Sequence, residues 1–271
     1  MEVIGKLFKK KSKGDEKFLN RVIAITNQKG GVGKSTTAVN ISAYLSSYGY
    51  KTLIIDLDPQ SNSTSGMGIN PGNVDKSIYD VIIADTDPHE AIIDTAYKNL
   101  RILPSSIQLA GAEVELVSSL KREYRLKEAV KGIEEEYDFI IIDCPPALGL
   151  LTINALSAAK EVIIPIQCEY YALEGLGQLL NTIDLVKKNL NEDLKISGAI
   201  MTMYDSRTKL GDQVIDEVKK YFSNKVYKTI IPRNIRLSEA PSHGKPIIDY
   251  DPDCRGAEAY NNFTKEVIDN G

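Results

Sequence analysis

The sequence predicts an α/β fold in which a doubly wound, mostly parallel sheet carries helices on both faces. Short runs of consecutive apolar residues recur from Arg21 onward. Runs that are apolar at every position are typical of strands covered on both faces. Longer segments with apolar residues at helical spacing separate them, and strands that alternate with helices are typical of a parallel sheet. The chain has 271 residues, which is enough to bury a sizeable core.

Seven runs are the predicted strands. In chain order they are VIAIT (22–26), TLIID (52–56), LRIL (100–103), DFIIID (138–143), EVIIPI (161–166), KISGAIMT (195–202) and KVYKTII (225–231). Two intervening segments repeat apolar residues at the spacing of three and four that indicates a helix. These residues are Leu173, Leu176, Leu180 and Ile183, then Leu210, Val214 and Val218. No internal repeat or linker divides residues 21–271, so we expect a single domain there.

Residues 1–20 differ from the rest, because they carry six lysines against three acidic residues. Their few apolar side chains, Val3, Ile4, Leu7 and Phe8, could share one helical face above a lysine-rich face. A solvated tail and a segment that contacts a membrane or partner both fit this pattern. We expect a flexible basic extension, since the apolar stretch is too short to hold a membrane alone.

The composition excludes several classes of protein. No apolar run approaches the roughly 20 residues that span a bilayer, and the N-terminus lacks a signal-peptide core. We therefore expect a cytoplasmic protein. The cysteines Cys144, Cys168 and Cys254 are odd in number and widely spaced, and the chain has two histidines. This pattern favours neither a disulfide framework nor a zinc site.

The stretch NQKGGVGKST, residues 27–36, indicates a phosphate site. It departs from the pattern G-x-x-x-x-G-K-[ST] at Gln28, which stands where the first glycine belongs. Its glycines let backbone N–H groups turn around phosphate oxygens, and the following helix N-terminus adds its positive dipole end. Lys34 is expected to reach the β- and γ-phosphates, and the Ser35 hydroxyl to ligate Mg²⁺. The predicted nucleotide contacts in this loop are Gly30, Gly31, Val32, Gly33, Lys34, Ser35 and Thr36.

Carboxylates at two strand ends extend this site to catalysis. Asp143 ends a hydrophobic strand, where a Walker B aspartate orients Mg²⁺ and its waters. Asp56 and Asp58 lie two residues apart on one side of another strand, just before Pro59. A lone aspartate at a strand end is most often a turn or cap residue, whereas the combination with the glycine-rich loop favours chemistry. Ser35, Asp58 and Asp143 are therefore the predicted groups around the metal.

The pattern K-G-G-x-G-K-[ST] is the deviant Walker A motif, and the sequence resembles the ParA/Soj family of partition ATPases, relatives of MinD. The resemblance covers essentially residues 21–271. The motifs that carry it are ITNQKGGVGKST, IDLDPQSNSTSG, IIIDCPPALGLLTINAL, QCEYYALEGL and IPRNIRLSEAPSHGKPI. In this family the extra lysine crosses a dimer interface to the other subunit's nucleotide. The resemblance therefore implies that Lys29 acts in trans in an ATP-bound homodimer.

The same resemblance implies roles for other residues. Asp58 would position the attacking water, Gln60 and the following SNSTSG would form a mobile switch, and Asp143 would be the Walker B residue. Pro232 and Asn234 fall where the family contacts adenine, although an ordinary turn would also explain them. ATP and Mg²⁺ are the implied cofactors, with Lys29, Lys34 and Asp58 as the catalytic set. Hydrolysis is expected to be slow without a partner.

Family resemblance also implies non-specific DNA binding through Arg207 and Arg236. Both lie in residues 187–245, which carry twelve lysines and arginines against seven acidic residues although the whole chain has a net charge of −4. Such a segment suits phosphate contacts. No helix-turn-helix or zinc-finger pattern is evident, so sequence-specific readout is not expected. A ParB/Spo0J-type centromere-binding partner is implied, together with a nucleoid-associated location.

Three alternatives remain open at this point. A MinD-like membrane-positioning ATPase typically ends in an amphipathic helix, but AEAYNNFTKEVIDNG has no basic stripe beside a large apolar face. An electron-transfer ATPase of the nitrogenase iron-protein type would need two cysteines at a dimer face. A nucleotide-switched scaffold with negligible turnover would differ only in rate.

Overall fold

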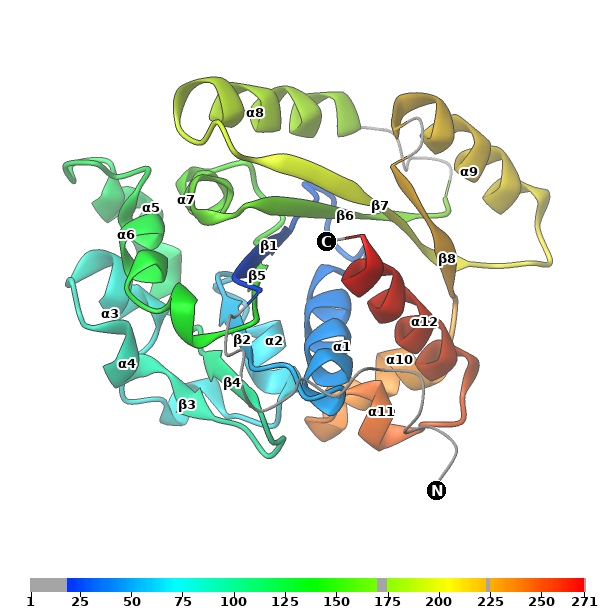
Figure 1. The fold of residues 1–271 in the computed structure, drawn as a ribbon, viewed down its shortest axis with the longest axis horizontal. Coiled ribbons are helices and arrows are strands. Elements are labelled where there is room, and N and C mark those ends of the chain that lie inside the picture. Colours follow the sequence, from blue (N-terminus) through cyan, green and yellow to red (C-terminus); the bar gives the residue numbers. More distant parts are fainter. Residues whose placement is uncertain (1–18, 170–174, 223–224, 271) are drawn as a thin grey trace.

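The computed structural model describes residues 19–169, 175–222 and 225–270. Nearly all of the predicted extension 1–20, and Leu173 of the predicted helical repeat, lie outside the described residues. Eight strands form one sheet in the order β3-β4-β2-β5-β1-β6-β7-β8 (Figure 1). The strands are β1 Arg21–Ile25, β2 Thr52–Asp56, β3 Ile93–Asp94, β4 Leu100–Leu103, β5 Phe139–Asp143, β6 Glu161–Gln167, β7 Lys195–Tyr204 and β8 Val226–Pro232. All neighbouring pairs are parallel except β3 with β4.

The α-helices lie in the connections between strands or follow the last strand, β8. They are α1 Lys34–Ser47, α2 Asn62–Gly66, α3 Ile78–Ile83, α4 Pro88–Ala91, α5 Leu109–Leu116, α6 Arg125–Lys131, α7 Leu150–Ala158, α8 Leu176–Asn189, α9 Lys209–Phe222, α10 Ile235–Glu239, α11 Ile247–Tyr250 and α12 Arg255–Asp269. Short 3₁₀ helices are η2 Pro71–Asn73, η3 Glu134–Glu136 and η4 Ala240–His243. The mostly parallel, doubly wound fold predicted from the sequence is confirmed.

The sheet is buried on both faces, and β1 shows how. Val22 and Ala24 belong to one apolar cluster, whereas Ile23 and Ile25 belong to another. Side chains that alternate along a strand point to opposite faces, so each face needs its own cover. Helices α7, α8 and α9 cover the first face, and α1 and α12 cover the second (Figure 1). This double burial explains why the strands are continuous apolar runs.

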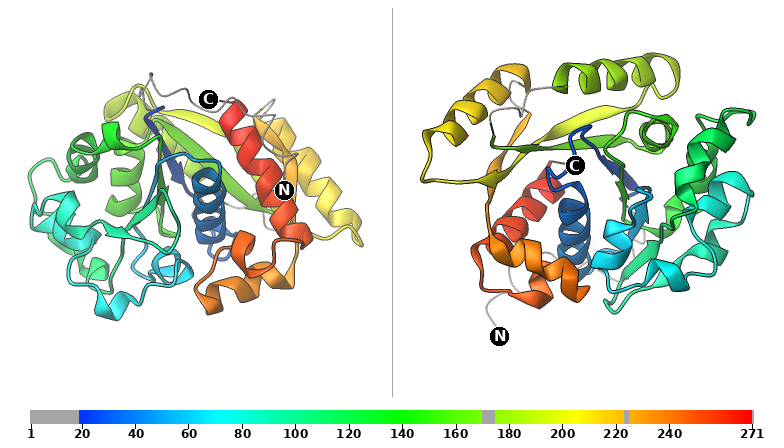
Figure 2. Two further views of the ribbon diagram at one scale, coloured as in Figure 1. Left: turned by 60° about the horizontal axis from the view of Figure 1, so that its bottom comes forward. Right: turned by 180° about the vertical axis from the view of Figure 1, so that it is seen from behind.

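The C-terminal helix α12 is part of the core. Tyr260 and Phe263 are buried against α1 and β8, and Figure 2 shows α12 beside α1 from two further directions. The buried Arg21 guanidinium pairs with Glu161 at 2.8 Å and donates to the Val267 carbonyl oxygen at 2.6 Å. This contact ties α12 to the starts of β1 and β6. The apolar side of α12 is therefore occupied within the fold.

The described residues contain no helix that is both long and apolar enough to cross a bilayer.

The position of β1 sets where a ligand binds. It lies between β5 and β6. The connection after β1 leads to β2 on one side of β1, whereas the connection after β5 leads to β6 on the other side. Ligands of open parallel sheets bind at the carboxyl ends of strands where the winding reverses in this way. The loop 26–33, which follows β1, lies at that point.

Candidate functional site

The loop between β1 and α1 takes a conformation that requires glycine at two positions. Gly31 has φ +74° and Gly33, the residue before α1, has φ +91°. A side chain at either position would be strained. A Cβ atom added at Gly31 would have no neighbour within 4 Å, so the space beside the loop is open. Val32 between them is buried, and its carbonyl oxygen accepts a hydrogen bond from Thr202 at 2.8 Å, which anchors the loop to β7.

Lys34, at the start of α1, is buried with its charge directed into the site. Its Nζ donates to the Lys29 carbonyl oxygen at 3.1 Å, so the loop curls around the ammonium group. Burial lowers the pKa of Lys34, whereas the charges of Asp143 and Asp58 act in the opposite direction. A buried cation beside an open glycine-rich loop suits a phosphate group.

Asp143 ends β5, and only one of its two carboxylate oxygens accepts a hydrogen bond. Oδ2 accepts a hydrogen bond from the Ser63 hydroxyl at 2.7 Å, but the buried Oδ1 has no hydrogen-bond partner. Burial raises the pKa of Asp143 to about 6, although the hydroxyls of Ser63 and Ser35 oppose this effect. An unpartnered buried carboxylate oxygen next to a serine hydroxyl fits a Mg²⁺ ion or one of its waters.

The described residues hold no group of three or more His, Cys, Asp or Glu side chains arranged for a metal. Mg²⁺ is commonly bound through one or two protein oxygens together with substrate phosphates and water. Asp143 and Ser35 supply two oxygen-bearing side chains of this kind.

Asp58 follows β2 and faces the same space. Its side chain is 5% exposed, and its Oδ1 accepts a hydrogen bond from the backbone N–H of Gln60 at 2.9 Å. The backbone N–H of Asp58 donates in turn to Asp56 Oδ1 at 3.2 Å. The two carboxylates therefore play different parts, since Asp58 lines the pocket and Asp56 lies fully buried behind it.

A pocket of about 530 Å³ unites most of the predicted residues. Its lining includes Gly30, Gly31, Gly33, Lys34, Ser35, Thr36, Asp58 and Gln60. It also includes Asn40, Met203, Pro241, Ser242 and Lys245, which were not singled out from the sequence. Pro241, Ser242 and Lys245 lie in the motif IPRNIRLSEAPSHGKPI, so the family resemblance of that motif was the sequence signal for them. Met203 had no sequence signal, but its φ of +52° is strained for a residue with a side chain.

Five of the residues predicted around the nucleotide and metal lie outside this lining, namely Lys29, Val32, Asp143, Pro232 and Asn234. Lys29 is half-buried, and its backbone N–H donates to Asn27 Oδ1 at 3.0 Å, while its side chain does not line the pocket of its own chain. Pro232 ends β8, and Asn234 caps α10 by accepting a hydrogen bond from the Arg236 backbone at 2.8 Å. Residues 240–242 of η4, further along the chain, line the pocket instead. Their adenine contacts stay a prediction.

Arg207 and Arg236 follow neighbouring strands, β7 and β8, at their carboxyl ends. Both side chains are exposed and pair with acidic neighbours. Arg207 contacts Asp205 at 2.6 Å, and Arg236 contacts Glu239 at 2.9 Å and Asp251 at 3.2 Å. Exposed ion pairs of this kind are weak. The fold thus brings the two arginines to one edge of the sheet.

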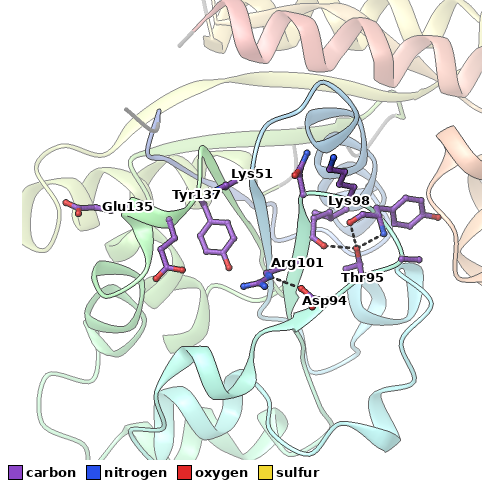
Figure 3. Close-up of a pocket in the computed structure, with 12 residues that line it drawn as sticks. Lys51, Asp94, Thr95, Lys98, Arg101, Glu135 and Tyr137 are labelled. Atoms are coloured by element: carbon purple, nitrogen blue, oxygen red, sulfur yellow. Dashed lines mark hydrogen bonds and ion pairs between the residues drawn. The ribbon is translucent and has the colours of Figure 1, made fainter. Parts of the chain in front are cut away.

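A larger pocket of about 610 Å³ lies elsewhere, beside Arg101 and Tyr137 (Figure 3). Its lining includes residues just before β2 and β5 and at the start of β4, which are the amino ends of those strands. Lys51, Lys98 and Arg101 stand against Asp94, Glu135 and Glu136 there, and Arg101 contacts Asp94 at 2.8 Å. The basic residues there are balanced by acidic ones, and the pocket lies at the amino ends of the strands, whereas ligands of such sheets bind at the carboxyl ends. This pocket is therefore a poor phosphate site.

The cysteines bear on the iron-sulfur alternative. Cys144 and Cys168 are buried, and burial raises the pKa of the Cys168 thiol to about 12. A cluster shared between two subunits needs thiolates at the surface. Neither of these thiols meets that need.

Comparisons with known proteins match nearly the whole chain. A family model described as an AAA domain matches residues 20–196. The chain is 60% identical over 253 residues to the sporulation initiation inhibitor protein Soj of Bacillus subtilis, which covers 93% of this chain and 100% of that protein. It is 49% identical over 250 residues to the chromosome-partitioning ATPase Soj of Treponema pallidum, which covers 92% of this chain and 98% of the relative.

One similar protein has been solved with a bound ligand. Cobyrinic acid a,c-diamide synthase of Mycobacterium smegmatis, determined with a bound ATP analogue and magnesium, is 40% identical to this chain. The two structures superpose with a TM-score of 0.83 over 92% of this chain and 94% of that one.

Proposed function

The chain belongs to the Soj/ParA family of chromosome-partitioning ATPases, and we propose from this premise that it is an ATP- and Mg²⁺-dependent DNA-partitioning switch. The observation that carries the proposal is the pair of lysines in one loop. Lys34 is buried in its own pocket, whereas the Lys29 side chain lies outside that pocket. Lys29 is thus free to serve the nucleotide of a second copy.

Each of these residues has its own role in ATP hydrolysis. Lys34 holds the β- and γ-phosphates in its own subunit, and Asp58 orients the attacking water. Asp143 and Ser35 would hold Mg²⁺, which would offset the negative charge of the phosphate oxygens. Phosphoryl transfer gathers negative charge on the γ-phosphoryl oxygens, so the Lys29 ammonium from the second copy stabilises the transition state as an arginine finger does.

Dimerisation follows from the same contact. Because Lys29 binds the γ-phosphate of the other subunit, ATP is part of the interface and hydrolysis weakens it. The closed dimer presents Arg207 and Arg236 from both copies, which gives it an avidity for nucleoid DNA that a monomer lacks. A ParB-type centromere-binding protein stimulates hydrolysis, and the ADP-bound subunits then release DNA.

The alternatives have less support. The Treponema pallidum relative is named a chromosome-partitioning ATPase, and the apolar side of α12 is buried, so a MinD-like membrane helix formed by α12 is not favoured. The scaffold alternative differs only in turnover.

Phosphate release with and without Mg²⁺ tests the enzymatic part. Wild-type protein should hydrolyse ATP slowly, chelation of Mg²⁺ should abolish hydrolysis, and Asp58→Ala should lose it while still binding ATP. Wild-type turnover in Asp58→Ala would remove Asp58 from its role, and no turnover in the wild type would leave the scaffold.

A further inference from the structure

Four buried residues form a closed ring of hydrogen bonds behind the pocket. The Asp58 N–H donates to Asp56 Oδ1 at 3.2 Å, and the Asp58 carbonyl oxygen accepts from the Ser105 hydroxyl at 2.7 Å. The Ser105 N–H donates to Thr64 Oγ1 at 3.0 Å, and that hydroxyl donates to Asp56 Oδ2 at 2.7 Å. The ring therefore holds the backbone of Asp58 by both its N–H and its C=O group.

The ring is shielded from water. Asp56, Thr64 and Ser105 are 0% exposed, and Asp58 is 5% exposed. Hydrogen bonds in such surroundings orient groups strongly, because no water competes for them. A small shift of one of the four residues therefore displaces the others.

The ring also joins three separate parts of the site. Asp56 ends β2 and lies opposite Asp143 in the sheet register. Thr64 lies in α2, next to Ser63, whose hydroxyl donates to Asp143. Ser105 follows β4, and it is 41 residues from Thr64 and 47 from Asp58. The path from the metal-binding carboxylate to the water-orienting carboxylate runs through these side chains.

We propose that Asp56, Thr64 and Ser105 are positioning residues for ATP hydrolysis, which hold Asp58 and α2 in the geometry that the reaction needs. The inference rests on the proposed function, since it assumes that Asp58 orients the attacking water. None of the three lines the pocket, so they act through Asp58 and not on the nucleotide.

Ser105→Ala and Thr64→Val test this ring. Ser105→Ala removes the donor to the Asp58 carbonyl, which keeps its bond from the Ser61 N–H at 2.8 Å, so the fold should survive. Thr64→Val removes the central hydroxyl, and Thr64→Ser restores it. Loss of such supporting contacts typically lowers activity about 10–100-fold. We expect kcat for ATP to fall about tenfold or more in Ser105→Ala and Thr64→Val, with KM within about twofold of wild type, and to recover in Thr64→Ser.

Ser157→Ala is the matched control, because the Ser157 hydroxyl is equally buried but has no hydrogen-bond partner. It should keep wild-type kcat. Unchanged kcat in both ring variants would overturn the inference, and so would a loss that Thr64→Ser does not restore or an equal loss in Ser157→Ala. Absence of turnover in the wild type would instead refute the proposed function, and the ring's role would fall with it.

Discussion

Lys34 and Lys29 lie five positions apart in one loop, yet their surroundings are opposite. Lys34 is buried and donates to the backbone of Lys29, whereas the Lys29 side chain is half-buried and outside the pocket. A cation that is already desolvated and aimed at a phosphate site binds a single phosphate chain closely. A cation outside its own site is available to another copy of the chain. The two residues should therefore respond differently to substitution.

Lys34→Ala should weaken ATP binding by about 10–100-fold, since a hydrogen bond to a charged group contributes about 1.5–3 kcal/mol. Calorimetric titration of the nucleotide in the presence of Mg²⁺ measures this loss. Ordinary affinity in Lys34→Ala, together with a normal dimer, would contradict the assignment of the buried lysine.

Arg236→Glu should abolish DNA binding while ATP binding survives, because the residue is exposed and lies outside the pocket. Lys131→Glu on α6 makes the same charge change on an exposed residue far from β8 in the sequence and serves as the control. An electrophoretic shift assay with ATP at several salt concentrations measures both, and wild-type binding should fall steeply with salt. Unchanged binding by Arg236→Glu would remove this residue from the DNA surface.

Single residues of the site differ in how far the sequence predicts them. Some residues lie in patterns that indicate a phosphate or metal site from the sequence alone, namely Gly31, Gly33, Lys34 and Asp143. Ser105 does not, because its contact with Asp58 exists only once β4 lies beside β2. A serine next to proline looks like any other turn residue in sequence.

At the scale of elements, α2 and η4 form two walls of the pocket, and the segments that follow these helices touch through Gly68 and Gly244. A Cβ atom at Gly244 would lie 2.6 Å from the Gly68 Cα, and Gly244 has φ +62°. Asn62, Ser65 and Gly66 of α2 line one wall, and residues of η4 line the other. The close approach of the two backbones therefore sets the width of the pocket.

Gly244→Ala should reduce the free energy of unfolding by about 1–3 kcal/mol, because both the left-handed backbone and the close contact oppose a side chain. It should also weaken ATP binding, since the walls must move apart. Gly177→Ala is the control, because Gly177 lies in α8 with no atom near an added Cβ, and alanine favours helix there. Thermal unfolding with and without nucleotide measures both variants. A Gly244→Ala protein as stable as wild type would show that the contact is loose.

Elements were predictable where their apolar pattern is long or complete. The seven continuous runs become β1, β2 and β4 to β8, and the periodic segments become α8 and α9. Strand β3 was not predicted, because two residues at a sheet edge, Ile93 and Asp94, leave no periodic signal. The wall formed by η4 could not be placed either, since its position depends on packing against α2 and not on local sequence.

At the scale of the whole molecule, one edge of the sheet carries the predicted functions. The loops after β1, β2, β5, β7 and β8 bring the phosphate loop, Asp58, Asp143 and the two arginines to the carboxyl ends of the strands. Met203, near the end of β7, and η4, which follows α10, line the pocket, and each lies a few residues along the chain from Arg207 or Arg236. A change at the nucleotide is therefore close in space to the proposed DNA surface.

The central claim is that ATP joins two copies of this chain through Lys29. Light scattering at moderate salt, with ADP and with ATP, measures the mass of wild type, Asp58→Ala and Lys29→Ala. We predict monomers with ADP, a dimer with ATP that Asp58→Ala makes persistent, and a Lys29→Ala protein that binds ATP but stays monomeric. An intact ATP-dependent dimer of Lys29→Ala, or a wild-type monomer in every condition, would contradict the claim.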